Sequence, residues 1–223
     1  MEGFLISFEG SDKSGKSSVI TKLGIFLFDE FGIRAVPFRE PGGTSIGEKI
    51  RNILHDHENT EMSAKTELFL YLASRSQLVE QRIKSELEKG SLVIIDRFGD
   101  SSKVYQGVGR ELGIDKVDEL NKYATGDLVP NLTVLLDVDL EIAEERSKND
   151  GVEINRMDIQ KADFKKRVRE AYLQLAKSDP YRWEVVNTSG KNINDVFSEV
   201  RTIVVRKLYQ EGFIETENKG KER

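Results

Sequence analysis

The sequence predicts an α/β fold in which helices cover both faces of a parallel sheet. Two observations support this prediction: short, continuously apolar runs recur along the chain, and longer stretches with apolar residues three or four apart lie between them. Continuous apolar strands are typical of sheets buried on both faces, and their alternation with helices is typical of parallel sheets. The predicted strands are residues 4–8 (FLISF), 33–38 (IRAVPF), 92–95 (LVII), 132–138 (LTVLLDV) and 183–187 (WEVVN).

The segments between these runs have the period of amphipathic helices. The predicted helices are a segment that begins near residue 16 and the segments 64–87, 139–148, 158–176 and 192–210. The chain has 223 residues, which suits a single domain, predicted to span residues 1–213. Residues 214–223 form a charged tail with nothing to bury, and we expect this tail to be disordered.

Composition excludes several classes of function. The formal net charge is −5, whereas proteins that grip nucleic acid usually have a basic excess, so no nucleic-acid partner is expected. Cysteine is absent, which removes disulfides, thiolate catalysis and a Cys-ligated zinc site. The two histidines, His55 and His57, lie in the acidic stretch HDHENTE; a metal pair is one interpretation, but a solvated loop is favoured.

Membrane association and export are not expected either. No apolar run has the length that a bilayer requires, so no membrane partner is expected. The first residues, MEGFLIS, contain an acid in place of the basic segment that opens a signal peptide. A cytoplasmic location is the resulting expectation.

A phosphate-binding loop follows the first predicted strand. Residues 10–17 read Gly10-x-x-x-x-Gly15-Lys16-Ser17, with a strand before and a helix after, which is the full P-loop pattern in its required context. Backbone N–H groups of such a loop bind the β-phosphate, the lysine reaches the β- and γ-oxygens, and the serine hydroxyl ligates Mg²⁺. The chain is therefore predicted to have a three-layer P-loop NTPase fold and to bind a nucleoside triphosphate. The predicted nucleotide-binding residues of the loop are Gly10, Ser11, Asp12, Lys13, Ser14, Gly15, Lys16, Ser17 and Ser18.

The P-loop alone does not name a reaction. A GTPase needs the guanine-reading pattern Asn-Lys-x-Asp, and NKYA at 121–124 lacks the aspartate. A small chain with further arginines at strand ends suggests a kinase that acts on a small acceptor.

Further charged residues lie where the carboxyl ends of the other strands are predicted, the edge at which parallel sheets bind ligands. Arg39 precedes the turn Pro41-Gly42-Gly43 and could address phosphate, although an ordinary surface turn is an equal alternative. Asp96 and Arg97 end the third strand; the acid would hold Mg²⁺ and the arginine phosphate, with a structural Asp–Arg pair as the alternative.

Tyr71 and Arg75 are four residues apart on a predicted helix and hence on one face. An aromatic ring could stack on a base, and the planar guanidinium of an arginine could donate hydrogen bonds to it. In isolation, a core tyrosine and a solvated arginine are the favoured interpretation.

Together these motifs resemble the thymidylate kinase family. The resemblance rests on FEGSDKSGKSS, REPGGTSIGEKIR, LFLYLASRSQLVE, DRFGDSSKVYQGVGR and PNLTVLLDVDLEIAEER, in family order and spacing, and covers residues 4 to 160. The resemblance implies a five-stranded parallel sheet with a small flexible lid, and the transfer of the γ-phosphoryl group of ATP to dTMP with Mg²⁺, giving dTDP and ADP. It also implies a homodimer.

The resemblance assigns roles to matching residues. For the acceptor, it implies that Arg39 and Arg97 clamp the phosphate, that Tyr71 stacks on thymine, and that Arg75 and Gln106 contact the base. Tyr105 would crowd the 2′ position of the sugar, Asp12 would approach the 3′-hydroxyl, and Ser101 belongs to the same substrate-binding set. The remaining matches are Asp96 and Glu40 near the metal, Glu40 also beside the substrate, and Arg146 against adenine.

The predicted lid, residues 147–156, differs from the commoner family pattern around Asn155 and Arg156. Some family members have a catalytic arginine in the P-loop, where this chain has Lys13, and others have a glycine there and use lid arginines. A solvated loop lysine is the alternative for Lys13. Lys13 and Arg156 are therefore predicted to join Lys16, Arg97 and Asp12 as catalytic residues. A divergent paralogue acting on another nucleoside monophosphate and a nucleotide-binding regulator without activity remain alternatives, and dTMP and dUMP are not separated by the sequence.

Overall fold

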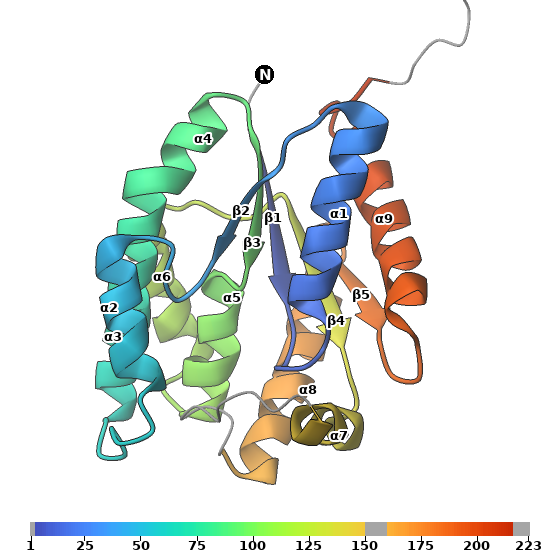
Figure 1. Cartoon of the computed structure of the whole chain (residues 1–223). Helices are drawn as coiled ribbons and strands as arrows, with labels where there is room; N and C mark the ends of the chain where they lie inside the picture. Colours follow the sequence, from blue (N-terminus) through green and yellow to red (C-terminus); the bar gives the residue numbers. More distant parts are fainter. Residues whose placement is uncertain (1–2, 150–159, 216–223) are drawn as a thin grey trace, which may run out of the picture.

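A computed structural model describes residues 3–149 and 160–215 of the chain and confirms the predicted fold class (Figure 1). The sheet has five strands in the order β2-β3-β1-β4-β5, and each paired strand runs parallel to its neighbour. The strands are β1 (Phe4–Glu9), β2 (Val36–Arg39), β3 (Leu92–Asp96), β4 (Leu132–Asp137) and β5 (Trp183–Asn187). All five predicted strands are confirmed, although β2 begins three residues later than predicted.

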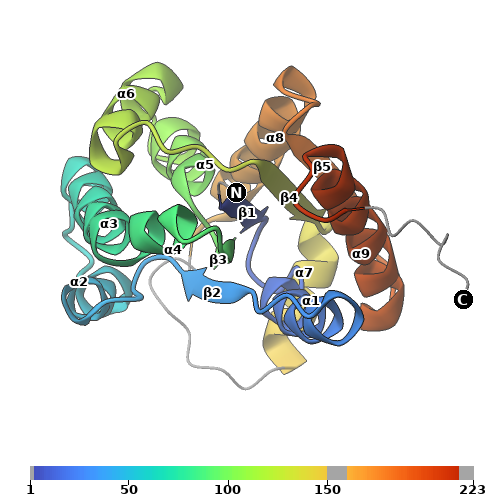
Figure 2. The ribbon, with the colours of Figure 1, turned by 90° about the horizontal axis from the view of Figure 1, so that it is seen from above.

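Helices cover both faces of this sheet. Viewed from above, α1 and α9 lie on one side of the strands, whereas α5 and α8 lie on the other (Figure 2). The helices are α1 (Lys16–Phe31), α2 (Ser45–His55), α3 (Ala64–Leu78), α4 (Lys84–Glu88), α5 (Gly99–Ser102), α6 (Ile114–Thr125), α7 (Leu140–Asn149), α8 (Ala162–Ser178) and α9 (Ile193–Gln210), with π-helical turns η1 (Val79–Ile83) and η2 (Lys103–Gly109). The predicted helix 64–87 is thus one helical run made of α3, η1 and α4.

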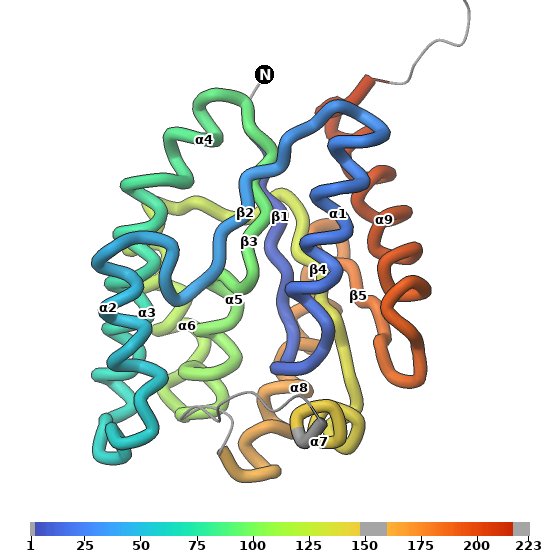
Figure 3. Tube along the Cα trace, viewed as in Figure 1, coloured from blue at the N-terminus to red at the C-terminus, as the bar shows by residue number. Residues whose placement is uncertain are grey.

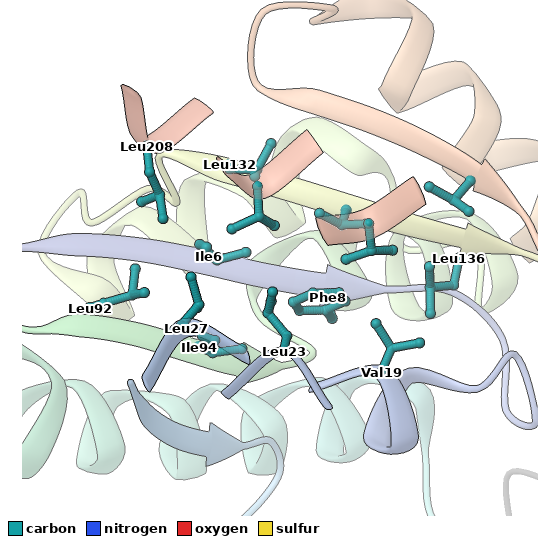
Figure 4. Close-up of a cluster of buried hydrophobic side chains, with 14 of the residues drawn as sticks. Ile6, Phe8, Val19, Leu23, Leu27, Leu92, Ile94, Leu132, Leu136 and Leu208 are labelled. Atoms are coloured by element: carbon teal, nitrogen blue, oxygen red, sulfur yellow. The ribbon is translucent and has the colours of Figure 1, made fainter. Parts of the chain in front are cut away.

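The central strand β1 explains why the strands are apolar without interruption. Phe4, Ile6 and Phe8 point into a cluster with α1 and α9, whereas Leu5 packs in a separate cluster with η1 and β3. The first cluster is drawn in Figure 4, where Val19, Leu23 and Leu27 of α1 meet the strands. Since successive side chains of a strand alternate between faces, both faces of β1 must be buried.

The last described residues return to the start of the sheet. The ring of Phe213, which follows α9, lies 5.6 Å from the ring of Phe4 at the beginning of β1. The loop that joins β1 to α1 lies at the opposite end of that strand, close to α7 (Figure 3).

The structure describes only parts of two predicted segments, the lid and the C-terminal tail. Residues 150–159 of the predicted lid and 216–223 of the predicted tail lie outside the described residues. Within those described, no helix combines the length and the apolar character that crossing a membrane requires.

Candidate active site

A cavity of about 760 Å³ opens at the carboxyl edge of the sheet, where the P-loop and the loops after β2, β3 and β5 meet. Residues 12–18 line its centre. Arg39, Tyr71 and Arg97 line one part, and Arg146 and Thr188 another. The site expected from the carboxyl ends of parallel strands is therefore present as one continuous space.

The P-loop has the backbone that its glycines permit. Gly10 has φ +132°, and Gly15, the residue before α1, has φ +97°. The Lys16 ammonium folds back over the loop and donates to the carbonyl oxygens of Gly10 (3.2 Å) and Ser11 (2.9 Å). Burial, reinforced by Arg97, lowers the pKa of Lys16 to about 8, against the opposing effect of Asp96 and Asp12.

We expect Gly10→Ala to destabilise the protein and to weaken ATP binding. A Cβ at Gly10 would lie 2.4 Å from the carbonyl oxygen of Leu136, and an L-residue at this φ is strained by about 1–3 kcal/mol. Gly24→Ala in α1 is the matched control; its Cβ meets nothing within 4 Å, and we expect a gain of about 0.5–1 kcal/mol. Urea unfolding and ATP titration measure both effects; a Gly10→Ala protein as stable as wild type would contradict the prediction.

Ser17 and Asp96 form an oxygen-rich pair beside the P-loop. The Ser17 hydroxyl donates to Asp96 Oδ2 at 3.1 Å, and the buried Oδ1 has no hydrogen-bond partner in the described part of the chain. Within that part, no group of three or more His, Asp or Glu side chains is arranged to hold a metal. Mg²⁺ prefers hard oxygen ligands and usually takes one or two carboxylates together with phosphate oxygens and water, so this pair fits Mg²⁺ beside a bound triphosphate.

Glu40, the other residue predicted near the metal, is bound to Arg75 through one of its two carboxylate oxygens. Its Oε2 atom accepts from Arg75 Nε at 2.7 Å and lies 2.6 Å from Nη2, in an ion pair whose side chains are 1% and 3% exposed. Burial raises the pKa of Glu40 to about 7, although Arg75 opposes this rise. Glu40 therefore lies in a buried ion pair at the cavity wall, while its Oε1, like Asp96 Oδ1, has no hydrogen-bond partner in the described part of the chain.

Arg97 lies between the P-loop and the acceptor side of the cavity. Its Nη2 donates to Asp12 Oδ1 at 2.8 Å, and its guanidinium lies 5.2 Å from the ring centroid of Tyr105. The ion-pair partner of Arg97 is thus Asp12, whereas the sequence alternative was a structural pair with Asp96. Burial alone would raise the pKa of Asp12, but Arg97 and Lys16 outweigh burial and hold the pKa at about 2.

The other predicted phosphate ligand, Arg39, is more exposed. Its side chain is 47% exposed and donates to both carboxylate oxygens of Glu48 and to the carbonyl oxygen of Pro41. Arg51 donates to the same carbonyl oxygen and also lines the cavity. Thr44 caps the following helix, α2, by accepting from the Gly47 N–H at 2.9 Å.

The structure places Tyr71 and Arg75, two of the predicted base contacts, in different surroundings. Tyr71 lines the cavity, but Arg75 is 1% exposed and is absent from the cavity wall. Besides Glu40, Arg75 donates to Ser102, Asn121 and the carbonyl oxygen of Phe98, which uses every donor of its guanidinium. The interpretation of Arg75 as solvated is wrong, and its predicted contact with a pyrimidine is not available in this conformation.

Tyr105, Gln106 and Ser101 all reach the cavity wall. Gln106 Nε2 donates to Glu67 at 2.8 Å, and the Ser101 hydroxyl donates to Glu9 at 2.6 Å. Helix α5 and the turn η2, which position these side chains, were not predicted.

A buried carboxylate next to the P-loop was also missed. Glu9 accepts from the Phe98 N–H (2.8 Å), the Ser101 hydroxyl and the Tyr172 hydroxyl (2.8 Å). Burial raises the pKa of Glu9. The only signal for Glu9 in the sequence is its position, as a charged residue at the end of an apolar strand. Glu9 thus links β1 to the loop after β3 and to α8.

Arg146 joins the P-loop to the loop after β5. It donates to the carbonyl oxygens of Lys13 (3.1 Å) and Thr188 (2.9 Å) and lines the cavity near Ile193. Lys13 itself has a left-handed backbone, with φ +63°. The predicted lid residue Arg156 lies outside the described residues.

Only one of the two histidines, His57, lies in an exposed turn as expected. His57 is exposed in the turn after α2, but His55 is the last residue of α2, is half-buried and lines the cavity. The loop interpretation is therefore wrong for His55, because α2 extends further than the polar composition suggests.

The P-loop, the paired Ser17 and Asp96 and a cavity with arginines beyond them define a P-loop phosphotransferase for small nucleotides. A sequence profile described as thymidylate kinase matches residues 8–200. The chain belongs to the thymidylate kinase family, and its activity is that of an ATP:dTMP phosphotransferase.

Individual relatives agree with this assignment. The thymidylate kinase of Limosilactobacillus fermentum is 45% identical over 205 residues, which cover 92% of this chain and 95% of the relative. That of Bacillus cytotoxicus is 43% identical over 209 residues, covering 93% and 100%. The crystal structure of thymidylate kinase from Ehrlichia chaffeensis superposes with a TM-score of 0.73 at 31% identity, covering 92% of this chain and 99% of that one. The family and activity that the motifs implied are confirmed.

Proposed function

We propose that the chain binds Mg-ATP on the P-loop and dTMP beside it, with the dTMP phosphate between Arg39 and Arg97 and thymine against Tyr71. The supporting observation is the contact between Arg97 and Asp12, which joins the acceptor side of the cavity to the P-loop at 2.8 Å. Arg146, on the far side of the loop, suits the adenine of ATP. Two nucleotides would then meet end to end over Lys16.

Phosphoryl transfer depends mainly on alignment and on positive charge around the transferred group. In the proposed arrangement, Lys16 and Arg97 flank the γ-phosphoryl group, and Asp12 orients the acceptor sugar. Ser17 and Asp96 would hold Mg²⁺, whose charge offsets that of the β- and γ-oxygens.

The acceptor base and sugar would be enclosed by Tyr71, Tyr105, Gln106 and Ser101, which line the same cavity. We assign Arg75 a positioning role, because its donors bind Glu40 and the backbone of Phe98 and so fix two walls of the acceptor site. Lid residues 147–156 would exclude water, which would otherwise compete as the acceptor.

An acceptor panel tests the proposal. The protein is mixed with Mg-ATP and dTMP, dUMP, GMP or no acceptor, and ADP is counted. We expect fastest release with dTMP, and slower release with dUMP, because the missing methyl group is worth about 1–3 kcal/mol in an apolar contact. Release independent of acceptor would indicate an ATPase, a preference for another monophosphate would indicate a divergent paralogue, and no release would indicate a regulator.

We expect Lys13→Ala to lower kcat while the affinity for dTMP changes little. Lys13 is proposed to supply part of the transition-state charge, so we expect a loss of about tenfold or more. The loss should stay below the roughly 10³- to 10⁵-fold of an arginine finger, since lysine is a point charge. Steady-state kinetics separate kcat from KM, and Lys13→Arg is the control that retains the charge. Wild-type turnover in Lys13→Ala would remove Lys13 from the catalytic set.

We also propose a homodimer. The support is an apolar surface on the packed helices α2 and α3, where Ile46, Ile53 and Phe69 are 52%, 47% and 58% exposed. Light scattering of the purified protein tests the dimer: a mass of one chain would refute it. The cytoplasmic location stays a prediction.

A further inference from the structure

An imidazole faces the acceptor side of the cavity without an assigned role. His55 ends α2, one helical turn after Arg51, and both line the cavity that Arg39, Tyr71 and Arg97 also line. In the part of the chain that the structure describes, no hydrogen bond or ion pair involves the His55 side chain. A polar, half-buried group without a partner in a substrate cavity is placed to bind substrate.

The charges around His55 favour its neutral form while the cavity holds no anion. Burial lowers the pKa of His55 to about 4, and Arg51 of α2, Arg97 after β3 and Arg39 at the end of β2 add to this effect. Asp12 of the P-loop opposes them but is itself paired with Arg97.

Other groups also lie near His55, and some of them oppose this effect. Its own helix favours the imidazolium, since cations are stabilised at a helix C-terminus. The Asp56 carboxylate beyond the helix accepts from the Glu58 N–H, and Glu48 is paired with Arg39. Tyr71 of α3 faces the same space.

We propose that His55 belongs to the acceptor-phosphate clamp and takes up a proton when the phosphate of dTMP binds. The inference rests on the proposed binding of dTMP at this end of the cavity. A phosphate monoester brings a charge of about −1.5 to −2 at neutral pH, which offsets the arginines that keep His55 neutral. The imidazolium then donates a charge-assisted hydrogen bond, and the proton returns to solvent when dTDP leaves.

The sign of the pH effect follows from this change. The pKa of His55 is higher in the dTMP complex than in the free protein, so the complex binds more protons between the two values. Affinity for dTMP therefore rises as pH falls through the pKa of the complex, and His55 adds nothing well above that value. A rise of about two pKa units corresponds to roughly tenfold tighter binding near pH 5 and no gain near pH 8.

The chain is well suited to a direct test, because it contains only two histidines. Proton NMR of the imidazole Cε1–H groups gives two signals, and His57→Gln assigns them. Each signal is followed over pH for the free protein, with dTMP and with thymidine. We expect dTMP to raise the pKa of His55 by at least about one unit, with no such rise from thymidine and none at His57. An unchanged His55, or an equal rise with thymidine, overturns the proposal.

Binding measurements give an independent test. Calorimetric Kd values for dTMP are compared near pH 5 and near pH 8 in wild type, His55→Gln and the matched control His57→Gln. The dTMP phosphate and Glu40 titrate in all three proteins, so only the difference between the variants reports on His55 and on its coupling to the phosphate. We expect His55→Gln alone to lose the roughly tenfold gain near pH 5. Binding of dTMP with no difference between the variants overturns the role of His55 only, whereas no binding of dTMP to wild type overturns the proposed function as well.

Discussion

Arg97→Gln is expected to lower kcat/KM for dTMP by about 10³- to 10⁵-fold, the range that a charge-stabilising arginine contributes to phosphoryl transfer. Arg97 is placed to act on both partners of the reaction, since it contacts Asp12 of the P-loop and lines the acceptor side of the cavity. Its side chain is only 16% exposed, so its charge acts in a partly desolvated space where electrostatic interactions are strong. Glutamine keeps part of the shape and removes the charge.

Three comparisons separate chemistry from binding. ATP affinity of Arg97→Gln, measured by titration, should change little, because Lys16 and the P-loop backbone remain. Arg39→Gln should mainly raise KM for dTMP, because Arg39 is 47% exposed and lies at the edge of the acceptor site. The kcat/KM of Arg97→Lys should lie between those of wild type and Arg97→Gln. Lysine keeps the charge but lacks the planar guanidinium that donates several hydrogen bonds in a fixed geometry. Near-wild-type turnover of Arg97→Gln would exclude Arg97 from the reaction.

Arg75→Met is expected to destabilise the protein by about 3–5 kcal/mol, the usual effect of breaking a buried ion pair by removing one partner. The variant would leave the Glu40 carboxylate buried and uncompensated, and would also leave Asn121 and Ser102 without their bonds to Nη1. Because Glu40 lies at the cavity wall, the same change should raise KM for dTMP.

Chemical denaturation measures this effect against a matched surface pair. Arg206 pairs with Glu184, but their side chains are 51% and 36% exposed, so Arg206→Met should cost only about 0–1 kcal/mol. The double variant Glu40→Leu/Arg75→Met should recover part of the loss, because it removes the unpaired charge. Equal losses for Arg75→Met and Arg206→Met would contradict the structural role assigned to Arg75.

The sequence predicted the sheet and the P-loop because each has a local signal. Apolar runs bounded by polar residues mark strands that are buried on both faces, and the P-loop pattern defines its own backbone between strand and helix. Helix α5 and the turn η2 have no comparable signal. Helix α6 was missed although Ile114, Val117, Leu120 and Ala124 are spaced three or four residues apart, as in an amphipathic helix. Glycines interrupt KVYQGVG, and the π-helical turn there does not follow the 3.6-residue period on which the prediction depended.

Side-chain roles were harder to predict than elements. Tyr71 and Arg75 do share a helix face, but that face runs from the cavity into the interior, so one turn of helix separates a cavity residue from a buried one. Glu9, Glu40 and His55 depend on neighbours far away in the sequence, and their pKa directions follow from burial, which a linear pattern does not report.

The contact between Phe4 and Phe213 has a practical consequence for handling the protein. It brings the start of the first strand and the segment after the last helix together, on the side of the sheet away from the cavity. A purification tag or fluorescent partner attached beyond Phe213 therefore leaves the entrance for nucleotides clear. The same proximity allows a short peptide to join the two ends in a circularly permuted enzyme.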